Sequence, residues 1–413
     1  MKFLYILALF FAMAFADKWA VLLAGSTGYY NYRHQSDVYH MYHVLLDHGF
    51  DPEHIITIAA DDLAYDKHNP FPGKVFNHPG NNQRNFYEGV VIDYKTEVSA
   101  EIYLNILLGN EEKVKELTHK DQVKVLKTDE GSNVFLYYID HGGTGIVAMP
   151  DDSFLEAKDL VATLVEMHEK KLFNRLVYYL EACESGSMWL DLPENINVYA
   201  LSSTVPDESS WGTYCPGEEE GHDDTVDGQH IGSCLGEVWS CFWLEQDDVE
   251  DLTKLSLQKQ FDDAKNFTTT SHPLQYGDLT WSDAPLSDFI AEVPSKRCMN
   301  TKRVPATKQW NSRDNALNFY EYQMKLGNSN AQKEYEQELA SRKEADEYFS
   351  KLVGKFGLNL LLDEEIKSIN WQCYSPALHK YHETHKFTDY SLKYAHTLAV
   401  LCNNIGVAVL NEM

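Results

Sequence analysis

Short apolar runs alternate with stretches of helical periodicity along the first 298 residues. Continuous apolar strands that alternate with helices are typical of a parallel sheet with helices on both faces. The expected strands are Trp19–Ala24, Ile55–Ala59, Val134–Ile139, Leu176–Glu181 and Val198–Ser202, and the expected helices are Ser36–His48, Ala100–Leu108, Asp159–Lys171 and Leu252–Phe267.

The pattern changes near residue 299. Beyond it the periodicity predicts only helices, at Arg313–Leu326, Ala331–Phe356 and Tyr390–Asn403. Charge changes at the same place. Residues 299–413 carry 14 basic and 14 acidic side chains, whereas residues 1–298 carry 21 and 49, which is the whole net charge of −28. We therefore expect an α/β domain over residues 17–298, a connector over 299–330 and a helical domain over 331–413.

The N-terminus has the pattern of a secretory signal peptide over residues 1–16. Lys2 precedes a 13-residue apolar run, Phe3 to Phe15, and Ala14-Phe15-Ala16 forms a cleavage signature. The run is shorter than the ~20 residues that span a bilayer, and no later run is long enough, so we expect no membrane span. A secretory route permits disulfides and glycosylation at the sequon Asn266-Phe267-Thr268. Seven cysteines is an odd number, which leaves one thiol free.

Composition excludes two classes of partner. A net charge of −28 disfavours nucleic acid and anionic membranes, while 44% apolar and 13% aromatic residues are enough for a globular core.

Reactive side chains follow three of the predicted strands. Arg33 and His34 come after the first, His141 after the third and Cys183 after the fourth. In an open parallel sheet these positions meet at one edge, where ligands bind. A thiolate beside an imidazole is the nucleophile–base pair of cysteine proteases. The backbone N–H groups of Gly142 and Cys183 are candidates for an oxyanion hole, and a helix starting after Cys183 would lower the pKa of its thiol.

Other readings of these residues are weaker. Ser185 or Ser187 as nucleophile lacks the G-x-S-x-G context. His40 and His43 lie three apart on one helix without an H-E-x-x-H motif, so we expect no metal site and no cofactor.

The chain resembles the legumain family of asparaginyl endopeptidases, also called vacuolar processing enzymes. The matching stretches are AGSTGYYNYRHQSD, DHGGTG, YYLEACESGSM, NINVYALSST, DESSWGTYCPG and DVEDLT, which span most of residues 19–290. The resemblance implies a caspase-like fold followed by a helical prodomain. In the tail it is carried by CYSPAL at 373–378 and by Leu401-Cys402.

The resemblance also implies roles for individual residues. Cys183 would be the nucleophile, His141 the acid–base partner, Asn31 its orienting group and Gly142 an oxyanion donor. Asp140 would form a succinimide. The pocket that reads asparagine would comprise Arg33, His34, Glu181, Ser210, Trp211 and Glu237. An asparagine amide has one acceptor and two donors, which Arg33 and the carboxylates would match.

Two departures from the family pattern concern the pocket and the cysteines. Gly236-Glu237 stands where the family usually has Gly-Asp, and Lys386 where a prodomain cysteine is expected. One prodomain disulfide, Cys373–Cys402, is implied. Cys215 and Cys234 stand where plant relatives have a local pair, and Cys241 and Cys298 are unassigned.

The resemblance implies a zymogen that cleaves protein and peptide substrates after Asn, and after Asp at acidic pH. Its own prodomain would be the intramolecular inhibitor, and cystatin-like proteins would inhibit it further. The protein would be located in a lysosome- or vacuole-like compartment, or it would be secreted or displayed at the cell surface. We expect activation in acid, with cleavage in the connector after Asn300, Asn311, Asn315 or Asn318; Asn328 and Asn330 lie just beyond these candidates. A peptide ligase using the same thioester, a catalytically silent binding protein and an Asp-specific protease are the alternatives.

Overall fold

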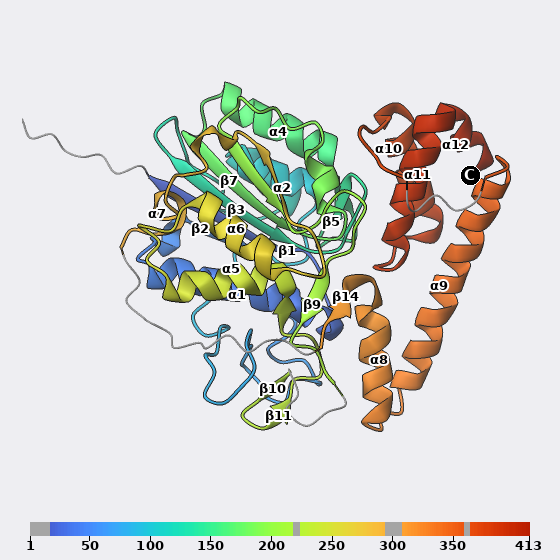
Figure 1. The fold of residues 1–413 in the computed structure, drawn as a ribbon, viewed down its shortest axis with the longest axis horizontal. Coiled ribbons are helices and arrows are strands. Elements are labelled where there is room, and N and C mark those ends of the chain that lie inside the picture. The colour runs from blue at the N-terminus through green and yellow to red at the C-terminus, as the bar shows by residue number, and fades with distance from the viewer. Residues whose placement is uncertain (1–16, 218–223, 294–307, 359–363) are drawn as a thin grey trace, which may run out of the picture.

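The computed structural model describes residues 17–217, 224–293, 308–358 and 364–413. The predicted signal peptide, residues 1–16, lies outside this part of the chain. At the centre is a six-stranded sheet in the order β13-β8-β7-β3-β1-β2, parallel except for β13 (Figure 1). Its strands are β1 (Lys18–Ala24), β2 (Ile55–Ile58), β3 (Asn133–Ile139), β7 (Arg175–Glu181), β8 (Val198–Ser202) and β13 (Leu274–Gly277).

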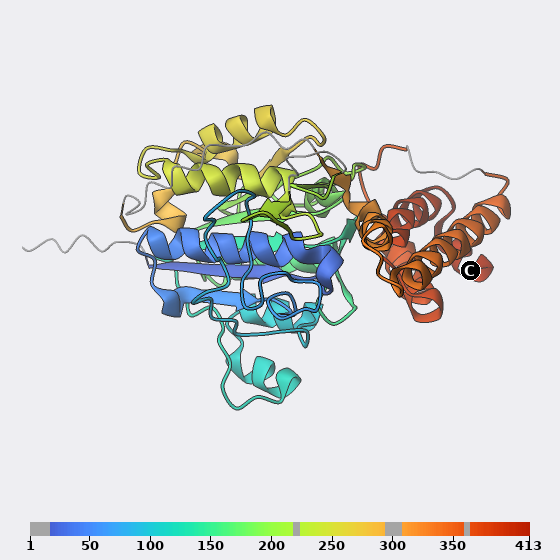
Figure 2. The same ribbon diagram turned by 90° about the horizontal axis from the view of Figure 1, so that it is seen from below.

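Helices cover both faces of this sheet (Figures 1 and 2). Successive side chains of a strand point to opposite faces, so Leu22 joins one buried cluster and Leu23 the other. The first face packs against α1 (Tyr32–Asp47), α5 (Val238–Val249) and α6 (Leu257–Phe267), and the second against α2 (Ala100–Leu107) and α4 (Ala157–Glu169). The predicted fold class, a mostly parallel sheet flanked by helices and followed by a helical region, is confirmed.

Short elements surround the carboxyl edge of the sheet. One small sheet has β9 (Trp211–Thr213) between β12 (Gly236–Glu237) and β14 (Trp310–Asn311), and another contains β4 (Gly142–Gly143), β5 (Ile146–Ala148) and β6 (Phe154–Glu156). The other α-helices and strands of the described residues before 294 are α3 (Glu111–Thr118), α7 (Ser287–Ile290), β10 (Thr225–Val226) and β11 (Gln229–His230).

The C-terminal part is helical, with α8 (Asn315–Lys325), α9 (Ala331–Gly354), α10 (Trp371–His385), α11 (Tyr394–Ile405) and α12 (Val409–Glu412). Its core also includes Ile146 and Phe154 from the sheet domain, so the two parts share a buried contact. The expectation of no strand after residue 299 was wrong, because β14 pairs with β9. None of the described helices has the length and hydropathy to cross a membrane.

Five described α-helices were not predicted, α3, α5, α7, α10 and α12, and the two longest of them are α5 and α10. The α5 helix is buried almost all round, so it lacks the one-sided apolar stripe on which helix prediction depends. The α10 helix contains Pro376, a residue that ordinarily breaks a helix interior. The predicted helix Leu252–Phe267 begins instead at Leu257, because the Ser256 hydroxyl caps it by accepting from Lys259 N.

Candidate active site

The ends of β3 and β7 bring the candidate nucleophile and base together. The two strands pair in register up to Ile139 and Glu181, and Asp140 N then donates to Glu181 O at 3.1 Å. The segments that follow β3 and β7 therefore leave the sheet side by side, with Asp140–Gly142 next to Ala182–Cys183. A Cβ on Gly142 would collide with the Cys183 carbonyl oxygen and lie 3.0 Å from Ala182 Cβ. Only glycine fits at this position.

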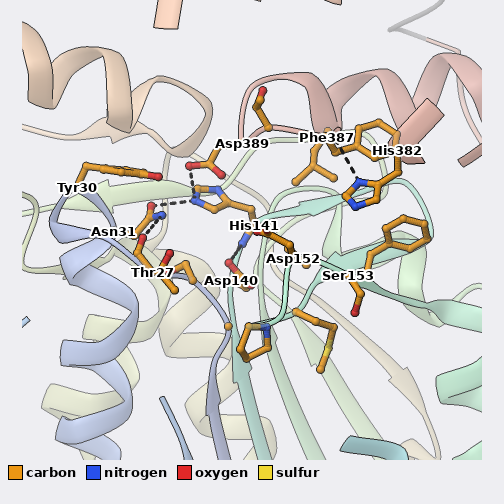
Figure 3. Close-up of a pocket in the computed structure, with 18 residues that line it drawn as sticks. Thr27, Tyr30, Asn31, Asp140, His141, Asp152, Ser153, His382, Phe387 and Asp389 are labelled. Carbon is orange, nitrogen blue, oxygen red and sulfur yellow. Dashed lines mark hydrogen bonds and ion pairs between the residues drawn. The ribbon is translucent and has the colours of Figure 1, made fainter. Parts of the chain in front are cut away.

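The His141 ring is held by its Nε2 atom. This nitrogen lies 2.9 Å from Asn31 Oδ1 and 3.1 Å from Asp389 Oδ2 (Figure 3). Amide and carboxylate oxygens are acceptors, so Nε2 carries the hydrogen. The other nitrogen, Nδ1, is buried and has no partner among the described residues. In a neutral ring Nδ1 is therefore the basic atom.

Cys183 is a buried thiol in this arrangement. Its Sγ lies 3.6 Å from Ser210 Oγ and accepts from Ser210 N at 3.3 Å. Burial raises the pKa of the thiol, although the Arg313 charge acts in the opposite direction. The expected helix after Cys183 is a five-residue 3-10 turn, Ser185–Trp189, so the stabilisation of a thiolate by an α-helix terminus does not apply.

The predicted specificity pocket centres on a buried ion pair. Arg33 Nε donates to Glu237 Oε1 at 2.6 Å, and both side chains are at most 1% exposed. Burial alone would raise the pKa of Glu237, but Arg33 and His34 lower it to about 2. His34 is neutral, since burial and the Arg33 charge lower its pKa to about 3. The longer Glu237 side chain, at the position where the family usually has aspartate, is thus accommodated in a direct ion pair with Arg33.

The other predicted pocket residues lie around this pair. Glu181 accepts from Ser240 N at 3.2 Å and Oγ at 2.9 Å, and burial and the Glu237 charge raise its pKa well above the usual range. Glu181 is therefore a neutral acid. Ser210 is buried between Cys183 and Ser312, while Trp211 is the partly exposed first residue of β9.

A carboxyl group that we did not predict supports the pocket from behind. Asp37 Oδ2 accepts from Glu237 N at 2.9 Å, and its Oδ1 accepts from Asn77 Nδ2 at 2.6 Å. Burial raises the pKa of Asp37 to about 8. Asp37 is four residues after Arg33 on α1, hence on the same helix face. This four-residue spacing from Arg33 was the feature of the sequence that could have predicted a role for Asp37 in the pocket.

Residues from the C-terminal part also enter the site. Ser312 Oγ donates to Glu237 Oε1 at 3.0 Å, and Arg313 Nη2 donates to Gly142 O at 2.6 Å and pairs with Glu184. With its amide oxygen turned toward Arg33, Asn315 accepts from Nη1 and Nη2 at 3.0 Å each. A cavity of 120 Å³ lies beside His141, which lines it together with His382, Phe387 and Asp389 of the C-terminal part (Figure 3).

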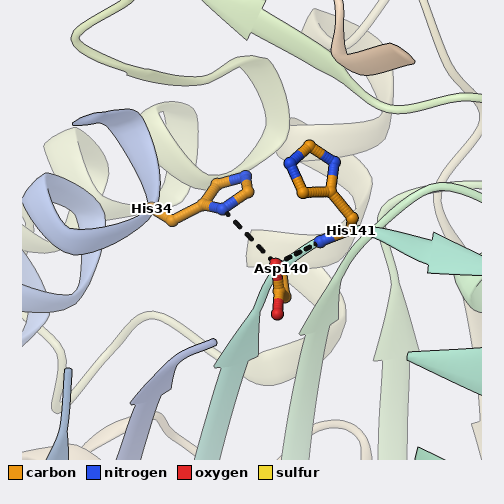
Figure 4. A group of neighbouring side chains, drawn as sticks. All are labelled: His34, Asp140 and His141. Atoms are coloured by element: carbon orange, nitrogen blue, oxygen red, sulfur yellow. Dashed lines mark hydrogen bonds and ion pairs between the residues drawn. The ribbon is translucent and has the colours of Figure 1, made fainter. Parts of the chain in front are cut away.

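One group of metal-ligand residue types lies within the described part of the chain. His34, Asp140 and His141 each have a ligand atom within 4.8 Å of the others (Figure 4). Burial raises the pKa of Asp140 well above its usual range, so this carboxyl is protonated. A neutral acid beside the charged Arg33 is a poor place for a cation. The Asp140 Oδ1 atom instead accepts from His141 N at 2.6 Å.

Four cysteines form two disulfides in the structure, Cys215–Cys234 and Cys373–Cys402. Cys183 and Cys241 are buried thiols, and Cys298 lies outside the described residues. The Asn266 side chain is exposed in the last turn of α6, away from these sites.

Comparisons with known proteins agree on one relationship. The profile described as "Peptidase C13 family" matches residues 18–301. A vacuolar-processing enzyme of Citrus sinensis is 34% identical over 416 residues, which cover 94% of this chain and 81% of that protein. Mouse legumain is 43% identical over 272 residues, 66% of this chain and 58% of legumain. This chain thus spans less than two thirds of legumain's length. Among solved structures, caspase-1 of Spodoptera frugiperda matches at a TM-score of 0.36 and 10% identity over 67% of this chain and 93% of that chain, too weakly to bear on the fold.

The close approach at Gly142 generates the first prediction. Gly142→Ala should destabilise the protein by about 1–3 kcal/mol, because the added methyl forces apart two packed strand ends. Gly354→Ala is the matched control, since a Cβ there meets nothing within 4 Å. That change should be neutral or slightly stabilising in the α9 helix. Denaturant unfolding of both variants measures the difference, and equal stability would contradict the packing described above.

Proposed function

Since this chain belongs to the peptidase C13 family, we propose that it is a cysteine endopeptidase that cleaves after asparagine and is made as a zymogen. The observation that carries the proposal is the meeting of Cys183, His141 and Gly142 at one sheet edge, beside a buried pocket built on Arg33 and Glu237. The reaction would be peptide-bond hydrolysis on protein substrates.

The chemistry follows from the tautomer of His141. Its Nδ1 takes the proton of the Cys183 thiol, and the sulfur attacks the scissile carbonyl carbon. The carbonyl oxygen becomes an oxyanion that the Gly142 and Cys183 N–H groups stabilise. The C–N bond then breaks, and the leaving amine takes the proton from His141. Water, activated by the same nitrogen, hydrolyses the thioester. The Asn31 amide oxygen holds the ring in this tautomer at 2.9 Å.

The pocket electrostatics support a preference for asparagine. An amide NH₂ can donate to ionised Glu237 while its oxygen accepts from Arg33. The tail gives both interactions a precedent, because the Ser312 hydroxyl donates to Glu237 and the Asn315 amide oxygen accepts from Arg33. An aspartate side chain would face a carboxylate with a pKa of about 2, so the substrate's own acid must take up the proton. Cleavage after aspartate would then require acidic pH.

Contacts of the C-terminal part support the zymogen proposal. Asp389 pairs with His141, Arg313 donates to the Gly142 carbonyl oxygen, and the Ser312 hydroxyl donates to Glu237. Burial keeps Cys183 as a thiol in this arrangement, although the Arg313 charge acts in the opposite direction. The predicted attraction between basic tail residues and the acidic domain is represented by Arg313 and Glu184, whereas the Asp389–His141 pair has the opposite polarity.

The local structure narrows the site of self-cleavage. Asn315 and Asn318 lie in α8, and Asn311, in β14, pairs with Trp211 of β9. Regular structure resists proteolysis, whereas exposed turns are preferred. Asn328 and Asn330 lie in the turn between α8 and α9, where Asn330 is exposed. We therefore favour cleavage in this turn; Asn300 lies outside the described residues.

Acidification changes the docking of the C-terminal part through several titratable groups, and their effects oppose one another. Burial and Lys386 lower the pKa of His382, so release of the tail lets His382 gain a proton below about pH 6.5. Burial alone would raise the pKa of Asp389, but its interactions with His141 and Arg33 lower it, which favours release only below about pH 4. Burial raises the pKa of Glu184 to about 7, and proton uptake there favours docking. Release in mild acid would therefore depend on His382.

The nucleophile prediction compares two buried thiols. Cys183→Ala should lower kcat on Asn peptides by about 10⁴-fold or more and should stop self-processing. Cys241→Ala, which removes the other described thiol, should leave both intact. Peptide cleavage and gel mobility after acid treatment provide the measurements. A Cys183→Ala protein that still matured in isolation would refute the assignment.

The pocket prediction concerns the planar guanidinium of Arg33. Arg33→Lys should cost about 2–5 kcal/mol in kcat/KM on Asn peptides, because a point charge cannot reproduce the fork and leaves Glu237 poorly paired. Glu237→Gln should raise the Asp-to-Asn cleavage ratio at neutral pH, because the repelling carboxylate is gone. Alkylation of Cys183 tests whether the dyad is intact in both variants. Unchanged Asn cleavage by Arg33→Lys would mean that another residue reads the amide.

The activation prediction concerns His382, whose titratable neighbours are Asp152, Lys386 and His379 and whose ring lies 5.6 Å from the Phe154 ring. His382→Phe removes the group that gains a proton on release, so self-processing should begin at a lower pH than in the wild type. His168→Gln, on α4, is the control and should not shift the onset.

Incubation of the pure chain across pH 4–7, followed by mass spectrometry of new C-termini, measures the pH onset and the cleavage site together. We expect termini at Asn328 or Asn330. An unchanged onset in His382→Phe would exclude the His382 trigger, and termini within α8 would exclude the turn as the cleavage site.

A further inference from the structure

A groove lies at the ends of α5 and α6, on a part of the surface that the proposed chemistry does not use. It encloses 580 Å³, and its apolar lining includes Phe242, Val249 and Phe267. Val249 and Phe267 are each 44% exposed, although they are large apolar side chains. Exposed apolar grooves with a few polar groups are typical of ligand-binding surfaces.

The groove is also lined by Gln246, one of whose two polar side-chain atoms has no hydrogen-bond partner among the described residues. Gln246 is only 6% exposed, and its Nε2 donates to Asp263 Oδ2 at 2.9 Å. Its Oε1 atom has no hydrogen-bond partner among the described residues. Since buried acceptors are almost always satisfied, this atom is suited to a donor that the protein itself does not provide.

The third observation is the position of the sequon. Asn266 is exposed at the last turn of α6 and itself lines the groove. Asn266-Phe267-Thr268 is an acceptor for N-linked glycosylation. A sugar attached to Asn266 Nδ2 would therefore start at the edge of the groove, next to the exposed Phe267 ring.

We propose that Asn266 carries an N-linked glycan whose first N-acetylhexosamine packs into this groove. In the attachment step a bond forms between Asn266 Nδ2 and C1 of the sugar. The bond from C1 to a lipid-linked pyrophosphate donor breaks, and the amide loses one proton. The apolar face of the sugar covers Phe267 and Val249, and its acetamido N–H donates to Gln246 Oε1.

The charge of the groove favours a neutral sugar over an anionic ligand. The acidic lining residues are Asp263, which pairs with Lys259, Glu245, which is 5% exposed and accepts from Tyr214 at 2.8 Å, and Glu250. This lining contains no basic side chain among the described residues. Carboxylates accept hydrogen bonds from sugar hydroxyls and repel phosphates and sulfates. The inference is independent of the proposed peptidase activity.

The first experiment measures occupancy. The full-length chain is secreted from a host limited to oligomannose glycans, and the peptide containing Asn266 is analysed by mass spectrometry. We expect a hexosamine-containing glycan on Asn266 and its loss in Asn266→Gln. A secreted chain with unmodified Asn266 would overturn the proposal.

The second experiment separates the first sugar from the rest of the glycan. Endoglycosidase H leaves one sugar on Asn266, whereas peptide N-glycosidase F removes all of it and converts Asn266 to aspartate. The protein trimmed to one sugar should keep the Tm of the full glycoform. Complete removal should lower Tm by about 2–4 °C, the size of shift expected for loss of one modest packing contact. Asn266→Asp is the matched control and should have the same lowered Tm.

The third experiment tests contact between the sugar and the groove. Val249→Ser should lower Tm more in the glycosylated protein than in the Asn266→Gln background, because contacting groups are not additive. Val407→Ser, at a comparably exposed valine of the C-terminal part (52%), should have the same effect in both. Additive effects of Val249→Ser and Asn266→Gln, or equal Tm for the trimmed and fully deglycosylated proteins, would place the glycan in solvent and overturn the proposal.

Discussion

The side-by-side exit of β3 and β7 from the sheet is the constraint on which the site depends. Parallel pairing continues to Ile139 and Glu181, so His141 and Cys183 reach the same edge at the same height. The segments that follow these two strands then approach each other so closely that only glycine is accommodated at position 142. This approach leaves a backbone N–H next to the sulfur-bearing residue. The fold thus brings the residues of the proposed dyad and the proposed oxyanion donor together through main-chain geometry.

A second constraint is electrostatic. Arg33, Glu237, Glu181 and Asp37 are all buried within the same region. Burying an unpaired charge costs several kcal/mol, so the protein has two ways to keep such groups inside. Arg33 and Glu237 remain charged and pair at 2.6 Å, while Glu181 and Asp37 are neutralised by raised pKa values. The pocket therefore has one cation and one anion, which suits a neutral polar side chain better than a charged one.

The C-terminal part pairs with the same groups to which we assign substrate binding in the proposed function. The Ser312 hydroxyl meets Glu237, the Asn315 amide meets Arg33, and Asp389 meets the His141 ring. Leaving such buried groups unpaired is costly, so the contacts that the tail makes with them stabilise its docking. Anything that releases the tail must replace these contacts with water or with substrate. This coupling links the stability of the C-terminal part to the accessibility of the sulfur.

The sequence by itself determined the parallel sheet, the helical tail and the residues at the strand ends. These features depend on local periodicity and on the rule that parallel strands end at one edge, and both can be read along the chain. Tertiary structure alone decided which distant groups meet. Asp389 lies 248 residues after His141, and no local pattern signals that contact. The α5 helix escaped prediction because it is buried on nearly every side, and the 3-10 turn after Cys183 replaced the expected helix. Burial also reversed the expected state of Cys183, because desolvation is a property of the packed protein and not of the residues next to the cysteine.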